Sequence, residues 1–163
     1  MINEFLAFDD FERKIAYNTL YAPIHKYRTT IVDPNTRKAF PPRKLNEPAT
    51  SPPVSELILQ TPLLPWKITV RPQIAQSKVV TNNDIFYAIH SALHVSVSSS
   101  EWERLGHGSK MQEKVSDAFR RRCKLLDTEV ENGIKRVDLL GGKTMFAGIE
   151  TKPNGIHELI LSI

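Results

Sequence analysis

Proline and glycine occupy separate parts of this 163-residue chain, and their positions limit where regular structure can form. Nine of the eleven prolines lie between Pro34 and Pro72, and all seven glycines follow residue 105. Because proline removes a backbone donor and disrupts helices, residues 34–53 are expected to form an extended connector without a helix, either a disordered linker or an ordered arm. We therefore predict three regions: an N-terminal helix and extended segment (1–33), a proline-rich arm or linker (34–61) and a compact domain (62–163).

The spacing of apolar residues predicts four helices. Residues 3–20 carry apolar side chains on two helical faces, so this N-terminal helix would be buried or would pair with a second chain. The other three are expected at residues 82–95 with Thr81 or Asn82 as the N-cap, from Ser99 or Ser100 onward, and at residues 109–126.

Alternating apolar and polar residues predict the strands. Residues 66–71 alternate cleanly, with Trp66 facing inward, and residues 55–60 form a further candidate strand. Because strands and helices follow one another in separate blocks, the predicted fold class is α+β, an antiparallel sheet with helices packed on one face. This sheet would contain strand 66–71 and a C-terminal three-strand meander at residues 134–140, 143–149 and 156–163.

One arginine lies among the apolar residues of the helix predicted at residues 109–126. At about 100° per residue, Arg122 falls in the middle of the apolar stripe of that helix. A buried guanidinium needs a carboxylate or carbonyl partner because it cannot shed its charge. The partner that we expect is Asp138 in strand 134–140, which gives a structural ion pair between Arg122 and Asp138.

The alternative is that Arg122 binds a ligand. Arg136 and Asp138 are two residues apart and would share one face of the predicted strand. Together with Arg122 and His90 they would line a pocket between helices and sheet, in a small-ligand-binding protein or an enzyme. No residue is assigned as catalytic or as a metal ligand, and no cofactor is predicted.

Other residues that could carry chemistry also have a structural explanation. His90 and His94 are one helical turn apart, a spacing that binds zinc where a third ligand converges, but an exposed polar ridge is the favoured interpretation. Trp66 and Trp102 could be binding-site aromatics, although a place in the core is favoured for both. Cys123 is the only cysteine, which favours a reducing, intracellular setting.

The net charge of +4 is unevenly distributed. Residues 26–48 and residues 110–124 each hold six Lys or Arg, which permits nucleic-acid binding, although a solvated basic face is the favoured explanation. No stretch approaches the length of apolar sequence that spans a membrane, and the acidic N-terminus is unlike a signal peptide. We expect a cytoplasmic protein, with the nucleus as an alternative.

Several short motifs occur together in a fixed order. They are Leu64-Pro65-Trp66-Lys67-Ile68, Val80-Thr81 before Asp84-Ile85, Ser100-Glu101-Trp102, Ala118-Phe119-Arg120-Arg121-Arg122, Arg136-Val137-Asp138-Leu139-Leu140-Gly141 and Phe146-Ala147-Gly148. The set resembles an uncharacterised domain family of small paralogous proteins in mushroom-forming basidiomycete fungi, over residues 62–149. The resemblance implies a fungal source and one compact domain, and it implies no activity.

The favoured function is a non-enzymatic protein-interaction or structural domain, which binds a protein partner or forms a homodimer. The second hypothesis is the ligand-binding protein or enzyme with a pocket around Arg122, Arg136 and Asp138. The third is nucleic-acid binding through residues 26–48 and 110–124, which predicts an affinity that falls steeply with added salt.

Overall fold

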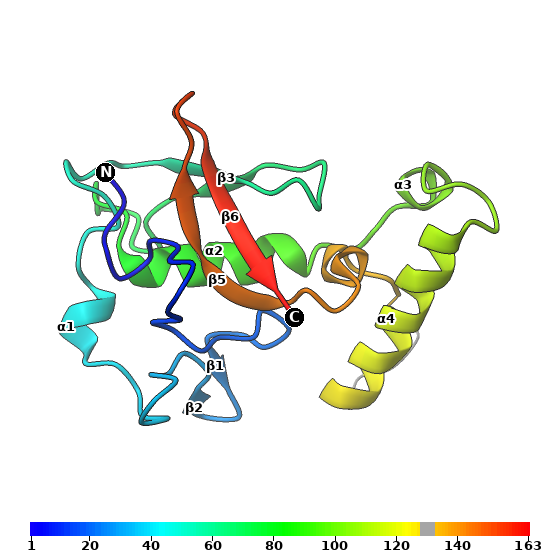
Figure 1. Ribbon diagram of the computed structural model, residues 1–163, viewed down its shortest axis with the longest axis horizontal. Helices are drawn as coiled ribbons and strands as arrows, with labels where there is room; N and C mark the ends of the chain where they lie inside the picture. Colours follow the sequence, from blue (N-terminus) through cyan, green and yellow to red (C-terminus); the bar gives the residue numbers. More distant parts are fainter. Residues whose placement is uncertain (128–132) are drawn as a thin grey trace.

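A mixed sheet occupies the centre of the computed structural model, which describes residues 1–127 and 133–163 (Figure 1). Across this sheet the strands are β4 (Ile68–Val70), β3 (Leu57–Gln60), β6 (His157–Ser162) and β5 (Met145–Thr151). The pairs β4–β3 and β6–β5 are antiparallel, whereas β3 and β6 run parallel. The α+β class is confirmed, but the prediction of a wholly antiparallel sheet is wrong, because β3 comes to lie between β4 and β6.

Helix α2 (Asn82–Leu93) contacts strand β4, and its start is specified by the local sequence. The hydroxyl of Thr81 accepts the backbone N–H of Asp84, and the Asp84 carboxylate accepts the backbone N–H of Thr81 at 2.8 Å. This reciprocal capping box satisfies two N–H groups at the helix terminus. Both the predicted helix and one of its two proposed N-caps are therefore confirmed.

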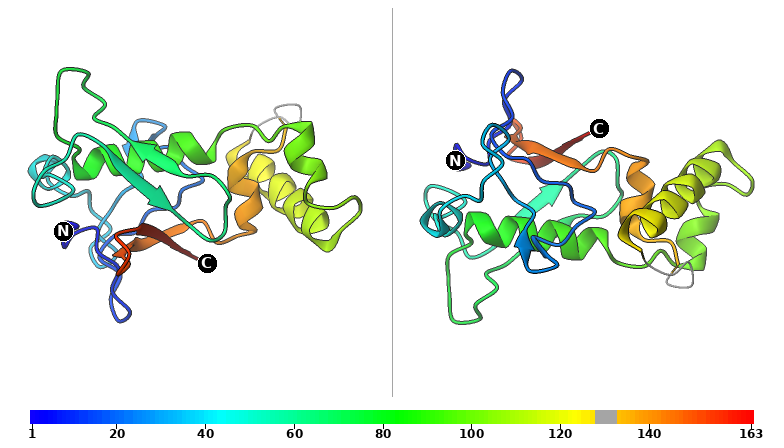
Figure 2. Two further views of the ribbon diagram at one scale, coloured as in Figure 1. Left: turned by 90° about the horizontal axis from the view of Figure 1, so that it is seen from above. Right: turned by 90° about the horizontal axis from the view of Figure 1, so that it is seen from below.

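Two further helices and a 3₁₀ helix gather beyond one end of the sheet (Figures 1 and 2). They are α3 (Ser99–Glu103), α4 (Lys110–Leu126) and η2 (Arg136–Leu140), and α4 contacts η2. The N-cap of α3 is Ser98, so the predicted N-caps, Ser99 or Ser100, are one or two residues too late. The predicted strand 134–140 is wrong: the Asp138 carboxylate accepts the backbone N–H of Lys135 at 2.9 Å, and this local cap starts a helical turn.

The N-terminal residues lie along the outer edge of β5, and the helix predicted at residues 3–20 is absent from this described segment. The backbone N–H of Ile149 donates to the Leu6 carbonyl at 2.8 Å, and the N–H of Phe146 donates to the Tyr17 carbonyl at 2.9 Å. Leu6 and Tyr17 are fully buried, whereas Phe11 is 98% exposed. Pairing with β5 thus holds Leu6 and Tyr17 in the core, whereas Phe11 points into solvent, so the apolar residues that suggested a helix do not share one buried face.

Strand β5 and the N-terminal segment approach closely at Gly148. The register of β5 against β6 is interrupted between Phe146 and Gly148, and Gly148 has a φ of 141°. A Cβ atom at this position would lie 2.5 Å from the Cα of Phe8. Only glycine therefore fits both the backbone conformation and the space.

The proline-rich segment is an ordered part of the fold. It follows a two-stranded hairpin of β1 (Ile24–His25) and β2 (Arg28–Thr29), and it contains the short helix α1 (Pro42–Leu45). The prediction that residues 34–53 contain no helix is therefore wrong, because α1 lies within them. Pro42 lies at the first position of α1, where its missing N–H is not needed.

Residues from all three predicted regions contribute to one hydrophobic core. The segment before residue 34 supplies Leu6 and Tyr17, and strand β3 supplies Leu59, which is also fully buried. These side chains belong to the same cluster as Phe86 of α2. Among residues 1–127 and 133–163, no helix combines the length and the apolar character needed to cross a bilayer.

Candidate functional site

A buried ion pair between Arg122 and Asp138 joins α4 to η2. Nε of Arg122 donates to Oδ1 of Asp138 at 2.8 Å, and Nη2 donates to Oδ2 at 3.0 Å. The same Nη2 also donates to the carbonyl of Gly133 at 3.0 Å. The two side chains are only 3% and 1% exposed. Each charge therefore has several partners inside the protein, as a buried pair requires.

A small cavity adjoins this ion pair. Its volume is about 220 Å³, and Arg122, Asp138, Leu20 and Thr144 are among its lining residues. Ligand pockets usually have volumes of about 300–1,000 Å³. Since the cavity is smaller than this and the Arg122 guanidinium already binds Asp138 twice, the geometry favours a structural role for the pair.

Arg136 has different neighbours and packs on Trp66. The guanidinium carbon lies 4.0 Å from the centroid of the Trp66 ring, within the range of a cation–π interaction. Nη2 of Arg136 is 3.8 Å from Oε2 of Glu101, which is a long ion pair. With about three residues per turn in η2, Arg136 and Asp138 do not share a face as they would in a strand. The predicted grouping of Arg136 with Arg122 and Asp138 is therefore not formed.

His90 stacks on His94 along α2. The ring centroids are 4.1 Å apart, and Nε2 of His94 donates to the Thr19 carbonyl at 3.1 Å. Burial, and then the neighbouring charge of His90, lowers the pKa of His94 from 6.5 to about 4. Burial also lowers the pKa of His90, and Lys135 adds to this effect. In residues 1–127 and 133–163, no three His, Cys, Asp or Glu side chains are placed to hold a metal ion.

The lowered pKa of His94 makes the stability of the protein depend on pH. The unfolded chain takes up a proton near pH 6.5, whereas the folded protein takes it up only near pH 4. The stabilisation is therefore complete above about pH 6.5 and is lost as the pH falls toward about 4. We expect the melting temperature of wild type to drop between about pH 7 and about pH 5.

His94→Gln tests this assignment, because glutamine can still donate to the Thr19 carbonyl but does not titrate. The variant is expected to show a smaller drop in melting temperature over the same pH range. His107→Gln, at an exposed position, serves as the control and should keep the wild-type dependence. An identical pH profile for His94→Gln and wild type would contradict the assignment.

A second pocket, here called the Trp66 pocket, lies between α3, α4, η2 and the segment before β4. Its volume is about 410 Å³, within the range of ligand pockets. Apolar side chains dominate its lining, and two of them are accessible: Leu63 is 36% exposed and Met111 is 46% exposed. The complete lining is Leu63, Pro65, Trp66, Glu101, Arg104, Leu105, Met111 and Leu139.

The Trp66 pocket is held in shape by capped helix ends. Oε1 of Glu101 accepts the backbone N–H of Ser98 at 2.9 Å and thereby fixes the start of α3. The buried side chain of Gln112 donates to the carbonyl of Trp102 at 2.9 Å and accepts the N–H of Gly108 at 2.9 Å. These bonds tie α3 to α4, so the lining residues of both helices are positioned before any ligand arrives.

The alternating pattern predicts a core position for Trp66, which in the structure packs against the core, is half-buried and also lines the pocket. The alternation of Trp66, Ile68 and Val70 is real, because Ile68 and Val70 are buried in β4. Trp66 itself precedes the strand. A signal for its different role was present in Pro65 and Leu63, two further accessible apolar residues beside it in the sequence.

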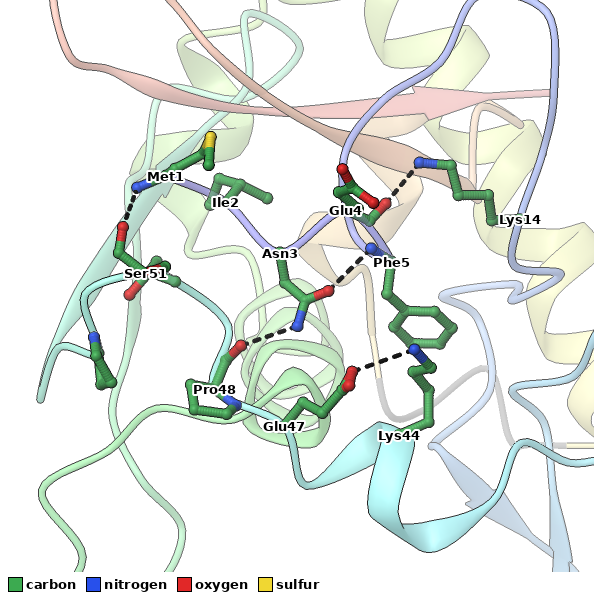
Figure 3. Close-up of a pocket in the computed structure, with 12 residues that line it drawn as sticks. Met1, Ile2, Asn3, Glu4, Phe5, Lys14, Lys44, Glu47, Pro48 and Ser51 are labelled. Atoms are coloured by element: carbon green, nitrogen blue, oxygen red, sulfur yellow. Dashed lines mark hydrogen bonds and ion pairs between the residues drawn. The ribbon is translucent and has the colours of Figure 1, made fainter.

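A more open groove of about 840 Å³ lies beside the N-terminus (Figure 3). Its polar groups bind one another. The N-terminal ammonium of Met1 donates to the Ser51 carbonyl at 2.8 Å, and Nδ2 of Asn3 donates to the Pro48 carbonyl at 3.0 Å. Lys44 pairs with Glu47 at 3.2 Å. A ligand would have to displace these contacts, so the groove is a weaker candidate than the Trp66 pocket.

The two basic segments lie at different places in the molecule (Figure 1). Residues 26–48 surround β2 and α1, and residues 110–124 belong to α4. Arg122, one of the six basic residues of the second segment, is buried and paired with Asp138. Nucleic-acid binding through these segments stays a prediction.

Comparison with known proteins identifies the family of this chain, but it does not indicate an activity. Residues 15–155 match a family of unknown function, DUF6699. This range is wider than the 62–149 suggested by the motifs, because it includes the proline-rich segment and part of the N-terminal region. Nothing matches among the curated proteins or the solved structures. Since the match covers most of the chain, the protein belongs to the DUF6699 family of unknown function.

Proposed function

We propose that this chain is a non-enzymatic protein-interaction domain and that the Trp66 pocket is its binding site. The observation that carries this proposal is the accessible apolar lining around Trp66, with Leu63 36% and Met111 46% exposed. Exposed apolar surface around an aromatic side chain is typical of sites where a partner inserts a side chain.

Two further observations support this choice of site. The apolar residues of segment 1–33, which suggested a homodimer, include Leu6 and Tyr17 of the protein's own core. The pair of Arg122 and Asp138, which suggested a ligand site, has its partners within the fold.

We also propose a cytoplasmic location for the protein. Its single cysteine, Cys123, is a buried free thiol, as is usual in a reducing compartment.

A peptide-display selection on the intact protein tests this proposal. Random peptides bound by wild type are eluted, synthesised and measured by fluorescence anisotropy against wild type and Met111→Gln. Because full burial of a methionine contributes about 1.5–3 kcal/mol and Met111 is 46% exposed, a partner gains about half of this, and we expect Met111→Gln to weaken binding about three- to tenfold.

Leu125→Gln is the matched control, because Leu125 is also an exposed apolar residue of α4 but lies outside the Trp66 pocket. It should leave the affinity of the selected peptides unchanged. Failure to select any peptide that distinguishes Met111→Gln from Leu125→Gln would refute the proposal.

A further inference from the structure

We propose that the partner segment taken by the Trp66 pocket is an acidic, apolar peptide: a bulky apolar side chain enters the pocket while a neighbouring carboxylate binds Arg104 and Arg136. This inference rests on the proposed function and names the chemistry of the partner. It is carried by the charges around the pocket and by the packing of Arg136 on Trp66.

Positive charge exceeds negative charge at and beside the pocket, where Arg104 and Glu101 are lining residues and Arg136, although not a lining residue, packs on the lining residue Trp66. Arg104 follows α3 directly, is exposed, and makes no ion pair within residues 1–127 and 133–163. The acidic group of the rim, Glu101, is already used: its Oε1 accepts the Ser98 N–H, and its Oε2 lies as far as 3.8 Å from Arg136. The backbone hydrogen bond from Ser98 also lowers the pKa of Glu101. The positive charges of Arg104 and Arg136 are therefore opposed only by the carboxylate of Glu101, which also caps α3.

The geometry of Arg136 leaves it able to bind a further anion. A guanidinium stacked on an indole keeps its N–H groups at its edge, in the plane where a carboxylate binds. The long distance to Glu101 means that this edge is not saturated by a close ion pair. A carboxylate beside Trp66 would complement this charge.

A peptide is the occupant that suits the shape of this surface. The exposed apolar side chains of Leu63 and Met111 come from different segments of the chain, before β4 and in α4. Apolar surface thus extends from the pocket over its margin, where a chain can continue beyond the inserted side chain. One buried anchor surrounded by a polar rim is the usual arrangement at peptide-binding sites.

The test compares acid and amide forms of each selected peptide, in which Asp is changed to Asn and Glu to Gln. We expect the selected sequences to carry an acidic residue beside a bulky apolar one, and the amide form to bind about tenfold more weakly, as the loss of a charge-assisted hydrogen bond implies. Arg104→Gln should weaken the acid form by a similar factor and leave the amide form nearly unchanged. The affinity of the acid form should also fall as salt is added.

Arg121→Gln is the matched control, because Arg121 is an exposed arginine of α4 outside this pocket and its loss should not alter peptide affinity. Peptides that bind equally well in acid and amide forms, and equally to Arg104→Gln, would overturn this inference while the proposed function stands. If no peptide responds to Met111→Gln, both fail. A pocket that takes a free aliphatic carboxylate such as decanoate, but no peptide, would also overturn both.

Discussion

Replacing Arg122 by alanine is expected to lower the free energy of unfolding by about 3–5 kcal/mol. The variant leaves the carboxylate of Asp138 buried at 1% exposure without its cation, and an unpaired buried charge is far more costly than the pair itself. It also removes the hydrogen bond from Nη2 to the Gly133 carbonyl. Urea denaturation followed by circular dichroism measures this loss directly.

Two comparisons make the Arg122 result specific. Arg120→Ala breaks the exposed pair of Arg120 with Asp117 on the same helix, and it should change stability by about 1 kcal/mol or less. The double variant Arg122→Ala, Asp138→Ala should lose less than the sum of the single variants, because neither charge is then left alone. Equal losses for Arg120→Ala and Arg122→Ala would refute a buried ion pair.

Replacing Gly148 by alanine is expected to lower the free energy of unfolding by at least about 2 kcal/mol, since backbone strain and overpacking each cost about 1–3 kcal/mol. The φ of 141° is unfavourable for alanine, and the new Cβ would lie 2.5 Å from the backbone Cα of Phe8. A backbone atom cannot rotate away as a flexible side chain can. Either the N-terminal segment or β5 must move.

Gly155→Ala is the control that separates the cost of backbone strain from the cost of the clash with Phe8. Gly155 also has a positive φ, 84°, but a Cβ there would meet no atom within 4 Å in the described structure. We expect about 1 kcal/mol for Gly155→Ala, the cost of backbone strain alone. Thermal and urea denaturation of both variants give the comparison, and a Gly148→Ala variant as stable as Gly155→Ala would contradict the close approach to Phe8.

Elements with local signals could be predicted from the sequence, and those that depend on distant pairing could not. Helix α2 starts at a capping box between Thr81 and Asp84, three residues apart, so a short stretch of sequence specifies it. The segment containing Leu6 has a helical apolar spacing, but the Leu6 carbonyl accepts the backbone N–H of Ile149, at the other end of the chain. No local pattern reveals that partner, and the tertiary pairing overrides the spacing.

The candidate site shows the same division. The apolar stripe around Arg122 indicated that its charge needs a buried partner, because the helix itself fixes which residues share a face. The prediction that Arg136 and Asp138 lie in a strand was wrong, because the Asp138 carboxylate caps the backbone at Lys135 and Arg136–Leu140 form a 3₁₀ helix. The contact of Arg136 with Trp66 joins residues seventy positions apart and could not be found from either neighbourhood.

The way the N-terminal residues lie against β5 has a consequence for how the protein avoids self-association. A strand at the margin of a sheet offers unpaired N–H and C=O groups to any other extended chain, which is a common route to aggregation. Here the N–H groups of Phe146 and Ile149 are already taken by Tyr17 and Leu6. Leu6 precedes the family match, which begins at residue 15. A fragment cut to the family limits would therefore lose the Leu6 carbonyl and leave the N–H of Ile149 unpaired at the edge of the sheet, where another chain could bind.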